Sequence, residues 1–206
     1  ERKKNKIKYV YHGIPEGYII NKSISSLPKR SGVLMLGGDS YQKNPENAIK
    51  AWNMLPEEQK IAHPLIIAGF TGSESSPVAK TIQELGITEH VNIKKWVDDS
   101  VLINLFQTSA LLLFASREEG FGFPLIQAMA CGTPVVSSEA EVLVEIGGGA
   151  ALTAPAENPT RLAEKMNSIL SSEKNWQDLH QKSLTRAENF TWNITCSHIA
   201  DTFKSY

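Results

Sequence analysis

Short apolar runs alternate along this chain with stretches of helical spacing, and this alternation constrains the fold more than any other feature. The predicted strands are apolar rather than alternating in polarity, and they cover 32–38, 64–69, 90–96, 110–115, 133–138 and 150–154. The predicted helices cover 45–55, 76–85, 99–109, 124–132, 158–170, 175–190 and 192–206. Apolar strands of this kind are typical of parallel sheets that carry helices on both faces. The sequence therefore predicts a doubly wound, mostly parallel Rossmann-like α/β sheet of about six strands.

Several residues are expected to mark where the helices begin and end. Asp99 or Ser100 is predicted to cap helix 99–109, and Thr191 the last helix, because short polar side chains accept hydrogen bonds from the first N–H groups of a helix. The glycines 147–149 are predicted to end a helix and turn the chain, with a ligand role as the alternative.

Composition excludes several classes of function. The 206 residues include 21 basic and 22 acidic side chains, which argues against a nucleic-acid-binding protein. The basic cluster at 1–8 is interpreted as a solvated end or linker, with a weak contact to phosphate or anionic lipid as the alternative. Two cysteines, Cys131 and Cys196, form neither a disulfide framework nor a metal site and favour a reducing compartment. No apolar run approaches the ~20 residues that span a bilayer.

Ligands of open α/β sheets bind outside the carboxyl ends of the strands, near the point where the strand order reverses. The loops that follow the predicted strands are therefore the candidate site, and they are 37–44, 69–76, 95–99, 115–123 and 137–141.

The loop at 115–123 combines two glutamates with the glycine-rich start of a helix. A helix N-terminus carries unpaired N–H groups and about half a positive charge, and glycine allows a close backbone approach, so this loop suits a phosphate. A carboxylate would repel that phosphate, so Glu119 is expected to face sugar hydroxyls instead. The alternative is a helix whose first turn is stabilised by nearby acids.

In the loop at 37–44, Lys43 can bring a point charge to a diphosphate. A solvated surface lysine is the alternative. The chain lacks a third glycine for a dinucleotide fingerprint after Gly37 and Gly38, and it lacks a Walker A sequence. None of the histidines has a partner at metal-ligand spacing, so no metal site is predicted; they are His12, His63, His90, His180 and His198.

Six segments of the chain follow one another in an order and at a spacing typical of one family, and they are GGDSYQKNPENAIKAW, LIIAG, VNIKKWVDDSVLINLFQTSALLLFAS, EEGFGFPLIQAMACGTPVVSS, EVLVEIGGGAALTAPAENPTRLAEKMNSIL and RAENFTW. Through these segments the chain resembles, from about residue 10 to its end, the retaining glycosyltransferases of group 1, also called family 4. The family's GT-B fold places two Rossmann-like domains across a cleft, and this chain resembles only the C-terminal, donor-binding half. The resemblance implies a linker at 1–14, a nucleotide-sugar-binding domain at 15–190, and a helix at 191–206 that returns toward an absent N-terminal acceptor domain.

The resemblance also implies the roles of individual residues. Glu119 and Lys43 are the implied catalytic residues: Glu119 contacts the hydroxyls of the donor sugar, and Lys43 neutralises the diphosphate. The other implied contacts with the nucleotide-sugar come from six residues. Gly38 allows the backbone to approach the ligand, and the loop at Val97 contacts the base. The backbone amides of Phe121, Gly122 and Phe123 hold the sugar and the phosphate, and Gln127 holds the ribose.

Two positions depart from the family pattern. Gln127 stands where the family has a second glutamate that holds the ribose hydroxyls, so a weaker, uncharged contact is expected there. Gly38 and Gln42 stand where an arginine often accompanies the lysine, so more of the diphosphate charge falls to Lys43 and the helix N-terminus.

The implied activity is transfer of a sugar, with retention, from a UDP-, GDP- or ADP-sugar to an acceptor hydroxyl, without a metal or other cofactor. The acceptor would be a glycan or lipid-linked glycan held by the missing domain, in polysaccharide biosynthesis. The implied place is the cytoplasm, with peripheral contact to the inner membrane face as an option, and the fragment alone is expected to be inactive. The alternatives are a non-catalytic nucleotide-sugar-binding domain, another GT-B enzyme such as an epimerase or sugar phosphorylase, and, less favoured, a dinucleotide oxidoreductase.

Overall fold

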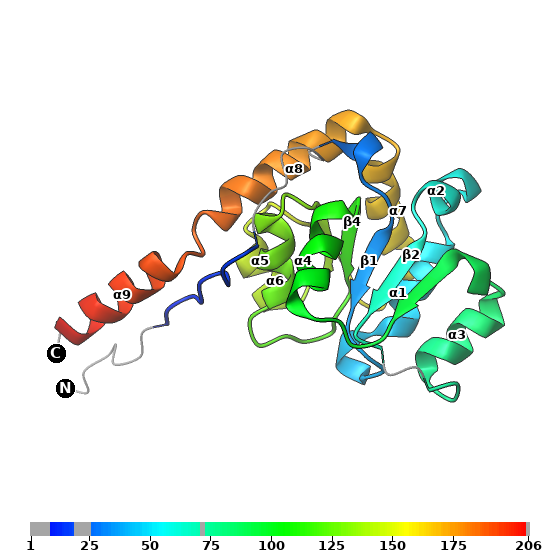
Figure 1. Ribbon diagram of the computed structural model, residues 1–206, viewed down its shortest axis with the longest axis horizontal. Helices are drawn as coiled ribbons and strands as arrows, with labels where there is room; N and C mark the ends of the chain where they lie inside the picture. Colours follow the sequence, from blue (N-terminus) through cyan, green and yellow to red (C-terminus); the bar gives the residue numbers. More distant parts are fainter. Residues whose placement is uncertain (1–8, 19–25, 71–72, 205–206) are drawn as a thin grey trace.

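A computed structural model describes residues 9–18, 26–70 and 73–204 (Figure 1). In this part of the chain, six parallel strands form one sheet in the order β3-β2-β1-β4-β5-β6. The strands are β1 Val33–Leu36, β2 Leu65–Ala68, β3 Val91–Lys94, β4 Leu111–Phe114, β5 Val135–Ser138 and β6 Leu152–Ala154. The helices are α1 Pro45–Asn53, α2 Glu57–Ala62, α3 Pro77–Leu85, α4 Asp99–Thr108, α5 Phe123–Ala130, α6 Glu141–Gly147, α7 Pro159–Leu170, α8 Glu173–Ala187 and α9 Trp192–Lys204, with short 3-10 turns η2 Leu27–Lys29, η3 Tyr41–Lys43 and η4 Thr88–His90. The predicted doubly wound α/β fold is confirmed.

The strand order reverses between β1 and β4, which lie side by side at the centre of the sheet. Their register pairs Val33 with Leu111 and Met35 with Leu113. Because the two strands are parallel, their carboxyl ends meet at one edge, and the loops that follow them leave from neighbouring positions. These are the loops that carry Lys43 and Glu119.

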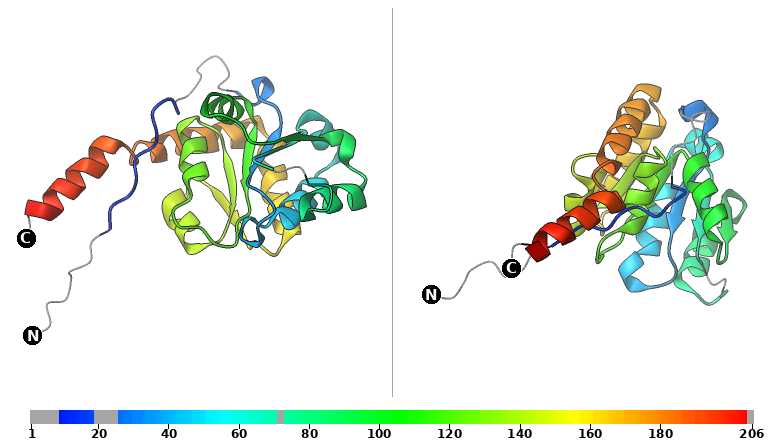
Figure 2. Two further views of the ribbon diagram at one scale, coloured as in Figure 1. Left: turned by 60° about the horizontal axis from the view of Figure 1, so that its bottom comes forward. Right: turned by 60° about the vertical axis from the view of Figure 1, so that its left-hand side comes forward.

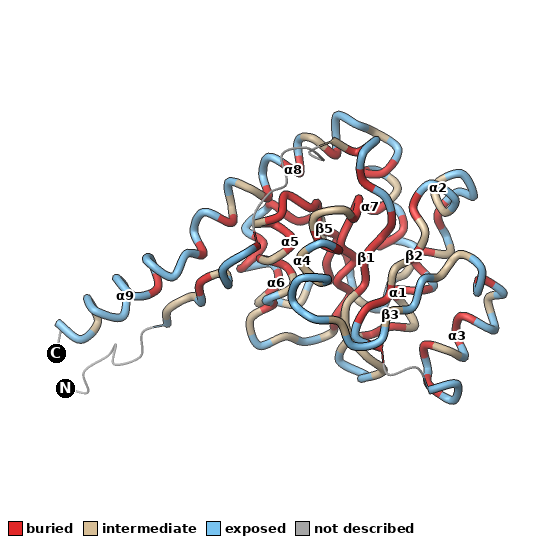
Figure 3. Tube along the Cα trace, in the orientation of Figure 1, coloured by how far each residue is buried: buried red, intermediate tan, exposed pale blue. Residues whose placement is uncertain are grey.

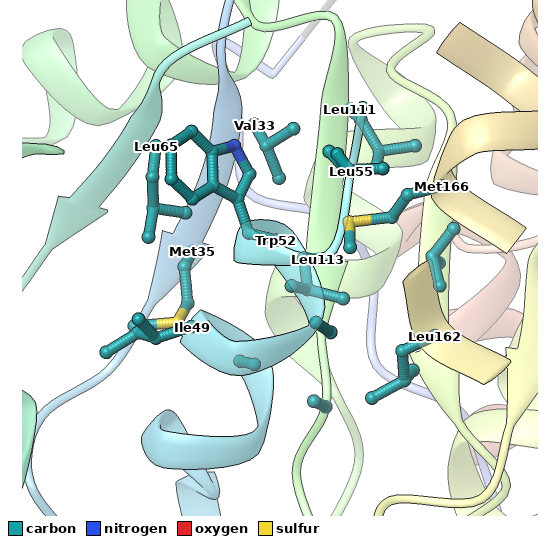
Figure 4. Packing of buried hydrophobic residues seen from close by; sticks show 14 of the residues in the cluster. Val33, Met35, Ile49, Trp52, Leu55, Leu65, Leu111, Leu113, Leu162 and Met166 are labelled. Carbon is teal, nitrogen blue, oxygen red and sulfur yellow. The ribbon is translucent and has the colours of Figure 1, made fainter. Parts of the chain in front are cut away.

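The first face of the sheet is covered by α1, α3 and α7. Alternate strand residues such as Val33, Met35 and Leu113 point toward these helices, and Trp52 of α1 is fully buried among them (Figure 4). The Trp52 indole N–H donates to the carbonyl oxygen of His63 at 3.0 Å, so its polar group is satisfied inside the core.

The second face is covered by α4, α5 and α6. The intervening strand residues, among them Leu34, Leu112 and Phe114, pack here against Ile126 and Leu143. Both faces are thus occupied by apolar side chains, which explains why the central strands β1, β2 and β4 are apolar throughout. The edge strand β3 differs, because it alternates with the polar residues Asn92 and Lys94 and is only half-buried. The tube view shows the same buried centre (Figure 3).

Two local predictions are confirmed and one is wrong. Thr191 caps α9, because its hydroxyl accepts from the N–H of Ile194 at 3.3 Å, and Gly148 ends α6 in the left-handed region at φ 54. The cap of α4 is Asp98, not Asp99 or Ser100. The Asp98 carboxylate accepts from the N–H of Val101 at 2.9 Å, which places the cap one residue before the predicted one.

The residues at 9–18 and α9 run together away from the sheet (Figures 1 and 2). The N–H of Ile14 donates to the carbonyl oxygen of Phe190 at 2.7 Å. The Thr195 hydroxyl donates to the backbone carbonyl oxygen of Tyr11 at 2.8 Å. Gly13 packs so closely on Trp192 that a Cβ there would lie 2.5 Å from the Trp192 nitrogen. The basic cluster at 1–8 lies outside the described residues. None of the described helices is long and apolar enough to cross a membrane.

Candidate functional site

Lys43 and Glu119 meet at the carboxyl edge of the sheet, although they lie 76 positions apart in sequence. The Lys43 Nζ atom donates to Glu119 Oε1 at 2.7 Å. The Lys43 side chain is 32% exposed and that of Glu119 is 13% exposed, so the pair is partly buried at this edge. The structure therefore brings together the residue expected at the diphosphate and the residue expected at the sugar.

Phe114, the last residue of β4, connects this ion pair to the start of α5. Lys43 Nζ lies 5.4 Å from the centroid of the Phe114 ring. A Cβ at Gly122 would lie 3.9 Å from the same ring. A cation, a carboxylate and a helix N-terminus are thus gathered around the end of one central strand.

The start of α5 has the form that the sequence predicts for an anion site. Gly122 is the N-cap at φ 90, and a Cβ there would lie 2.7 Å from the Leu143 side chain, so the position requires glycine. Pro124 has no N–H group, and the N–H of Leu125 already donates to the Gly122 carbonyl oxygen at 2.9 Å. The amides that the helix presents at its positive end are therefore those that precede Pro124.

Two residues that the sequence analysis did not select shape the Lys43 loop. Gly37 has φ 115, and a Cβ there would lie 3.0 Å from Lys43 Cγ, whereas one at Gly38 would make only an ordinary 3.6 Å contact with the Gly69 carbonyl oxygen. Asn44 is buried in the left-handed region at φ 54, and its amide donates to the carbonyl oxygens of Ala115 at 3.0 Å and Ala156 at 2.8 Å. The steric demand for glycine thus falls on Gly37, and the backbone approach predicted at Gly38 stays a prediction.

Arg117 and Glu157 form a second ion pair beside the first. Arg117 Nε donates to Glu157 Oε1 at 2.5 Å. This hydrogen bond raises the pKa of Arg117 and lowers the pKa of Glu157, in each case as the largest cause. Arg117 stands directly before the paired glutamates, so its place in the loop is a signal that sequence reasoning missed. Glu157 has no such signal.

Phe121 and Phe123 belong to an aromatic cluster with the entering segment of the chain. The Phe121 ring lies 5.1 Å from that of His12, 5.2 Å from that of Phe123 and 6.3 Å from that of Tyr11. The Tyr11 hydroxyl donates to Glu145 at 2.5 Å, and this bond is the main cause that raises the pKa of Tyr11 to about 12. A cavity of about 590 Å³ opens beside the cluster and is lined by Tyr9, Val10, Tyr11, His12, Gly120, Phe121, Val142, Glu145 and Ile146.

Val97 follows β3 at the same edge of the sheet, and Gln127 lies on α5. Val97 lies in the loop between β3 and α4 and packs, half-buried, against the second-face core, while the neighbouring Trp96 is 84% exposed. Gln127 is half-buried one turn into α5, four residues after Phe123. Their assignments to base and ribose stay predictions.

A second cavity of about 560 Å³ lies between the α6–β6 turn and α8, and it contains none of the predicted site residues; among its lining residues are Gly148, Gly149, Lys182 and Arg186. Among the residues that the structure describes, no group of three His, Cys, Asp or Glu side chains could hold a metal ion. The prediction that transfer needs no metal remains a prediction.

Sequence and structure comparisons both find glycosyltransferases and related enzymes that are similar to this chain. O-antigen chain mannosyltransferase B of Escherichia coli is 26% identical over 172 residues, which are 83% of this chain and 45% of that protein. HepE of Anabaena, crystallised with UDP and glucose, superposes with a TM-score of 0.81 at 21% identity, over 97% of this chain and 57% of HepE. Sucrose-phosphate synthase from Thermosynechococcus elongatus superposes with a TM-score of 0.80 at 20% identity, over 96% of this chain and 52% of the synthase.

The chain spans about half the length of these relatives. The two structural likenesses, at this level of identity, show a shared fold. The model of the family described as glycosyl transferases group 1 matches residues 20–186, most of the chain. The chain therefore belongs to the group 1 glycosyltransferase family.

Proposed function

We propose that this chain is the donor-binding domain of a retaining glycosyltransferase that transfers a sugar from a nucleoside-diphosphate sugar to an acceptor hydroxyl. The observation that carries the proposal is the contact between Lys43 and Glu119 beside the start of α5. A diphosphate needs positive charge and a sugar needs hydrogen-bond acceptors, and this edge offers both within one ion pair.

Lys43 and α5 would stabilise the leaving diphosphate. The charge that develops as the bond to the anomeric carbon breaks can be compensated by the ammonium of Lys43 and by the amides of Phe121, Gly122 and Phe123, which are fixed before the reaction begins. An ammonium group has three N–H donors, so Lys43 can keep its bond to Glu119 while it donates to a phosphate oxygen.

Glu119 would bind the hydroxyls of the donor sugar. An ionised carboxylate is an acceptor only, with two oxygens, and it forms strong hydrogen bonds with hydroxyl donors. Lys43 occupies one of these oxygens, Oε1, so the other oxygen, Oε2, would accept from a hydroxyl of the sugar. The expectation that Glu119 faces the sugar and not the phosphate is part of this proposal.

The relatives support a nucleotide-sugar donor. HepE is described in complex with UDP and glucose, and the Escherichia coli relative is named a mannosyltransferase. UDP-, GDP- and ADP-sugars all fit the chemistry of this edge, since the predicted base contact at Val97 lies in a different loop from the phosphate site. Retention and the absence of a metal requirement belong to the proposal through the family resemblance.

The whole protein would pair this domain with an N-terminal domain that binds a glycan or lipid-linked glycan. The joint course of residues 9–18 and α9 away from the sheet supports this, because both connections to such a domain would leave from one place (Figure 2). The proposed boundaries remain 1–14, 15–190 and 191–206, and the proposed place is the cytoplasm or the inner membrane face.

Calorimetric titration of the chain with UDP, GDP and ADP and their sugars tests the proposal. One nucleotide should bind clearly better than the other two, and one of its sugars should bind better than the nucleotide alone. Failure of all six classes of ligand to bind would contradict the proposal.

The second candidate is a nucleotide-sugar-binding domain without catalysis, and Gln127 in place of a glutamate favours it. A transfer assay on the intact protein that contains this chain separates the two, with lipid-linked and free glycans as acceptors. Nucleotide-sugar binding without transfer to any acceptor would favour the second candidate. Interconversion of free nucleotide-sugars, or dependence on inorganic phosphate, would instead indicate an epimerase or a phosphorylase.

A further inference from the structure

The loop that carries Lys43 is short and has little internal structure of its own. It consists of the glycines 37 and 38, one 3-10 turn at Tyr41–Lys43, and Asn44 in the left-handed region. The N–H groups of Lys43 and Asn44 bond within this turn, at 3.0 Å to Ser40 and 3.2 Å to Tyr41. The position of the Lys43 ammonium therefore depends on what holds the loop from outside.

Arg117 holds this loop by three different contacts. Its backbone N–H donates to the Gln42 carbonyl oxygen at 2.7 Å, and its guanidinium donates to the Tyr41 carbonyl oxygen. The guanidinium also stacks on the Tyr41 ring at 4.0 Å from the centroid. Tyr41 and Gln42 are the two residues directly before Lys43, so Arg117 fixes the turn that presents the lysine.

Glu157 anchors the same guanidinium to a third loop. Its two carboxylate oxygens accept from Arg117 Nε at 2.5 Å and Nη2 at 3.2 Å, a bidentate arrangement, and Oε2 also accepts from Asn47 Nδ2 at 2.9 Å. Asn47 Nδ2 lies 3.0 Å from Asn44 Oδ1, and Asn44 in turn bonds to Ala115 and Ala156. A closed network thus joins the loops after β1, β4 and β6 around Lys43.

We infer that Arg117 is a positioning residue that, with Glu157, sets the place of Lys43 for the donor diphosphate, an inference that rests on the proposed function. The rival is a direct contact between Arg117 and the diphosphate, which would replace the arginine that the family often has near the lysine. The geometry favours positioning, because the guanidinium is already engaged by a carboxylate, a carbonyl oxygen and a ring, and its side chain is only 18% exposed.

The two roles predict different responses to Arg117→Lys, compared with Arg117→Met, and opposite responses to Glu157→Gln. A lysine at 117 keeps the charge but loses the planar fork and the stacking, so Arg117→Lys should weaken binding nearly as much as Arg117→Met if the role is positioning. Glu157→Gln should also weaken binding, because the anchor is lost. If Arg117 touched the diphosphate directly, Arg117→Lys would keep most of the affinity and Glu157→Gln, by releasing the guanidinium, would raise it.

The experiment is calorimetric titration of the chain and its variants with UDP, GDP and ADP, at one ionic strength. Both Arg117 variants should weaken the binding of the preferred diphosphate about tenfold. In a Lys43→Met background, Arg117→Met should cause little further loss, because its effect passes through the lysine. Arg161→Met is the matched control, since Arg161 bonds Glu164 on the surface of α7 and should change nothing.

Each result decides the question. Full affinity of Arg117→Lys, higher affinity of Glu157→Gln, or additive losses with Lys43→Met would overturn the positioning role. Glu157 is 62% exposed, so its variant tests the same contact with little risk to folding, and thermal unfolding checks every variant. If the unchanged chain binds none of the three nucleotides, the proposed function itself fails; if it binds and the Arg117 variants bind equally well, only the inference fails.

Discussion

Replacing Glu119 by alanine should change the binding of a nucleotide-sugar and of its bare nucleotide in opposite directions. The nucleotide-sugar loses the acceptor for its hydroxyls, and this weakens its binding. The bare nucleotide makes no contact with that carboxylate, but it gains a lysine that no longer has an anionic partner. The contact between Lys43 and Glu119 is the reason to expect the second effect.

The geometry of the pair sets the size of both effects. At 2.7 Å, two unit charges attract by about 1.5 kcal/mol in bulk water and about 6 kcal/mol at an effective dielectric constant of about 20. Because Lys43 is 32% exposed, solvent screening and desolvation leave about 1 kcal/mol, so bare nucleotide should bind up to about fivefold more tightly. A lost hydrogen bond to a charged group costs about 1.5–3 kcal/mol, or roughly 10- to 150-fold.

The ratio of the two affinities isolates the sugar contact, because the release of Lys43 affects both ligands equally. Calorimetric titration of the chain and of Glu119→Ala, with the preferred nucleotide and its sugar, should show this ratio fall by at least about tenfold. Glu118→Ala is the control, since Glu118 is a neighbour in the same loop and makes no contact in the proposed site. An unchanged ratio would refute the sugar role, and weaker binding of the bare nucleotide would refute the competition for Lys43.

Three further predictions follow from the same structure. Lys43→Met should weaken nucleoside diphosphate binding about tenfold or more in calorimetry, and the loss should shrink at high salt. Gly122→Ala should destabilise the fold by about 1–3 kcal/mol in thermal unfolding, because of its φ of 90 and its tight surroundings, whereas Gly120→Ala, with open space at its Cβ, should not. Burial lowers the pKa of His63 and of His180 in the folded chain. As the pH falls, these two histidines are therefore protonated in the unfolded chain at a higher pH than in the folded chain. The free energy of unfolding should therefore fall as the pH drops below about 6.5, by up to about 1.4 kcal/mol per pH unit and histidine, and Tm measured against pH should show a fall that His180→Gln flattens.

The fold was largely predictable because its central strands are buried on both faces. A residue such as Leu112 has helices on either side of its sheet, so the apolar run itself marks the strand. Helix α2 was missed because none of its residues is buried, which leaves no apolar stripe to detect. The cap of α4 was misplaced by one residue because Asp98, Asp99 and Ser100 are all good capping residues, and only backbone geometry selects among them.

The site was predictable in its parts but not in its contacts. The rule that ligands bind at the carboxyl ends of strands placed Lys43 and Glu119 at one edge. Their direct contact depends on β1 and β4 being neighbours, and the network of Arg117 and Glu157 depends on where the loop after β6 turns. The spacing of residues in the sequence predicts neither the contact between Lys43 and Glu119 nor the network of Arg117 and Glu157, because both depend on strand order and on loop conformation.

The balance of charge at this edge connects two departures from the family pattern, namely Gln127 in place of a glutamate and the lack of an arginine beside Lys43. Lys43 is paired with Glu119 and Arg117 with Glu157, so neither pair adds net charge before a ligand arrives. A diphosphate then has to be compensated by the amides before Pro124 and by the remaining donors of Lys43. A second glutamate at position 127 would add a negative charge on α5 to that demand, and a glutamine does not. We therefore expect the missing acid and the missing arginine to offset each other, so that Gln127 weakens the ribose contact while it lessens the repulsion of the diphosphate.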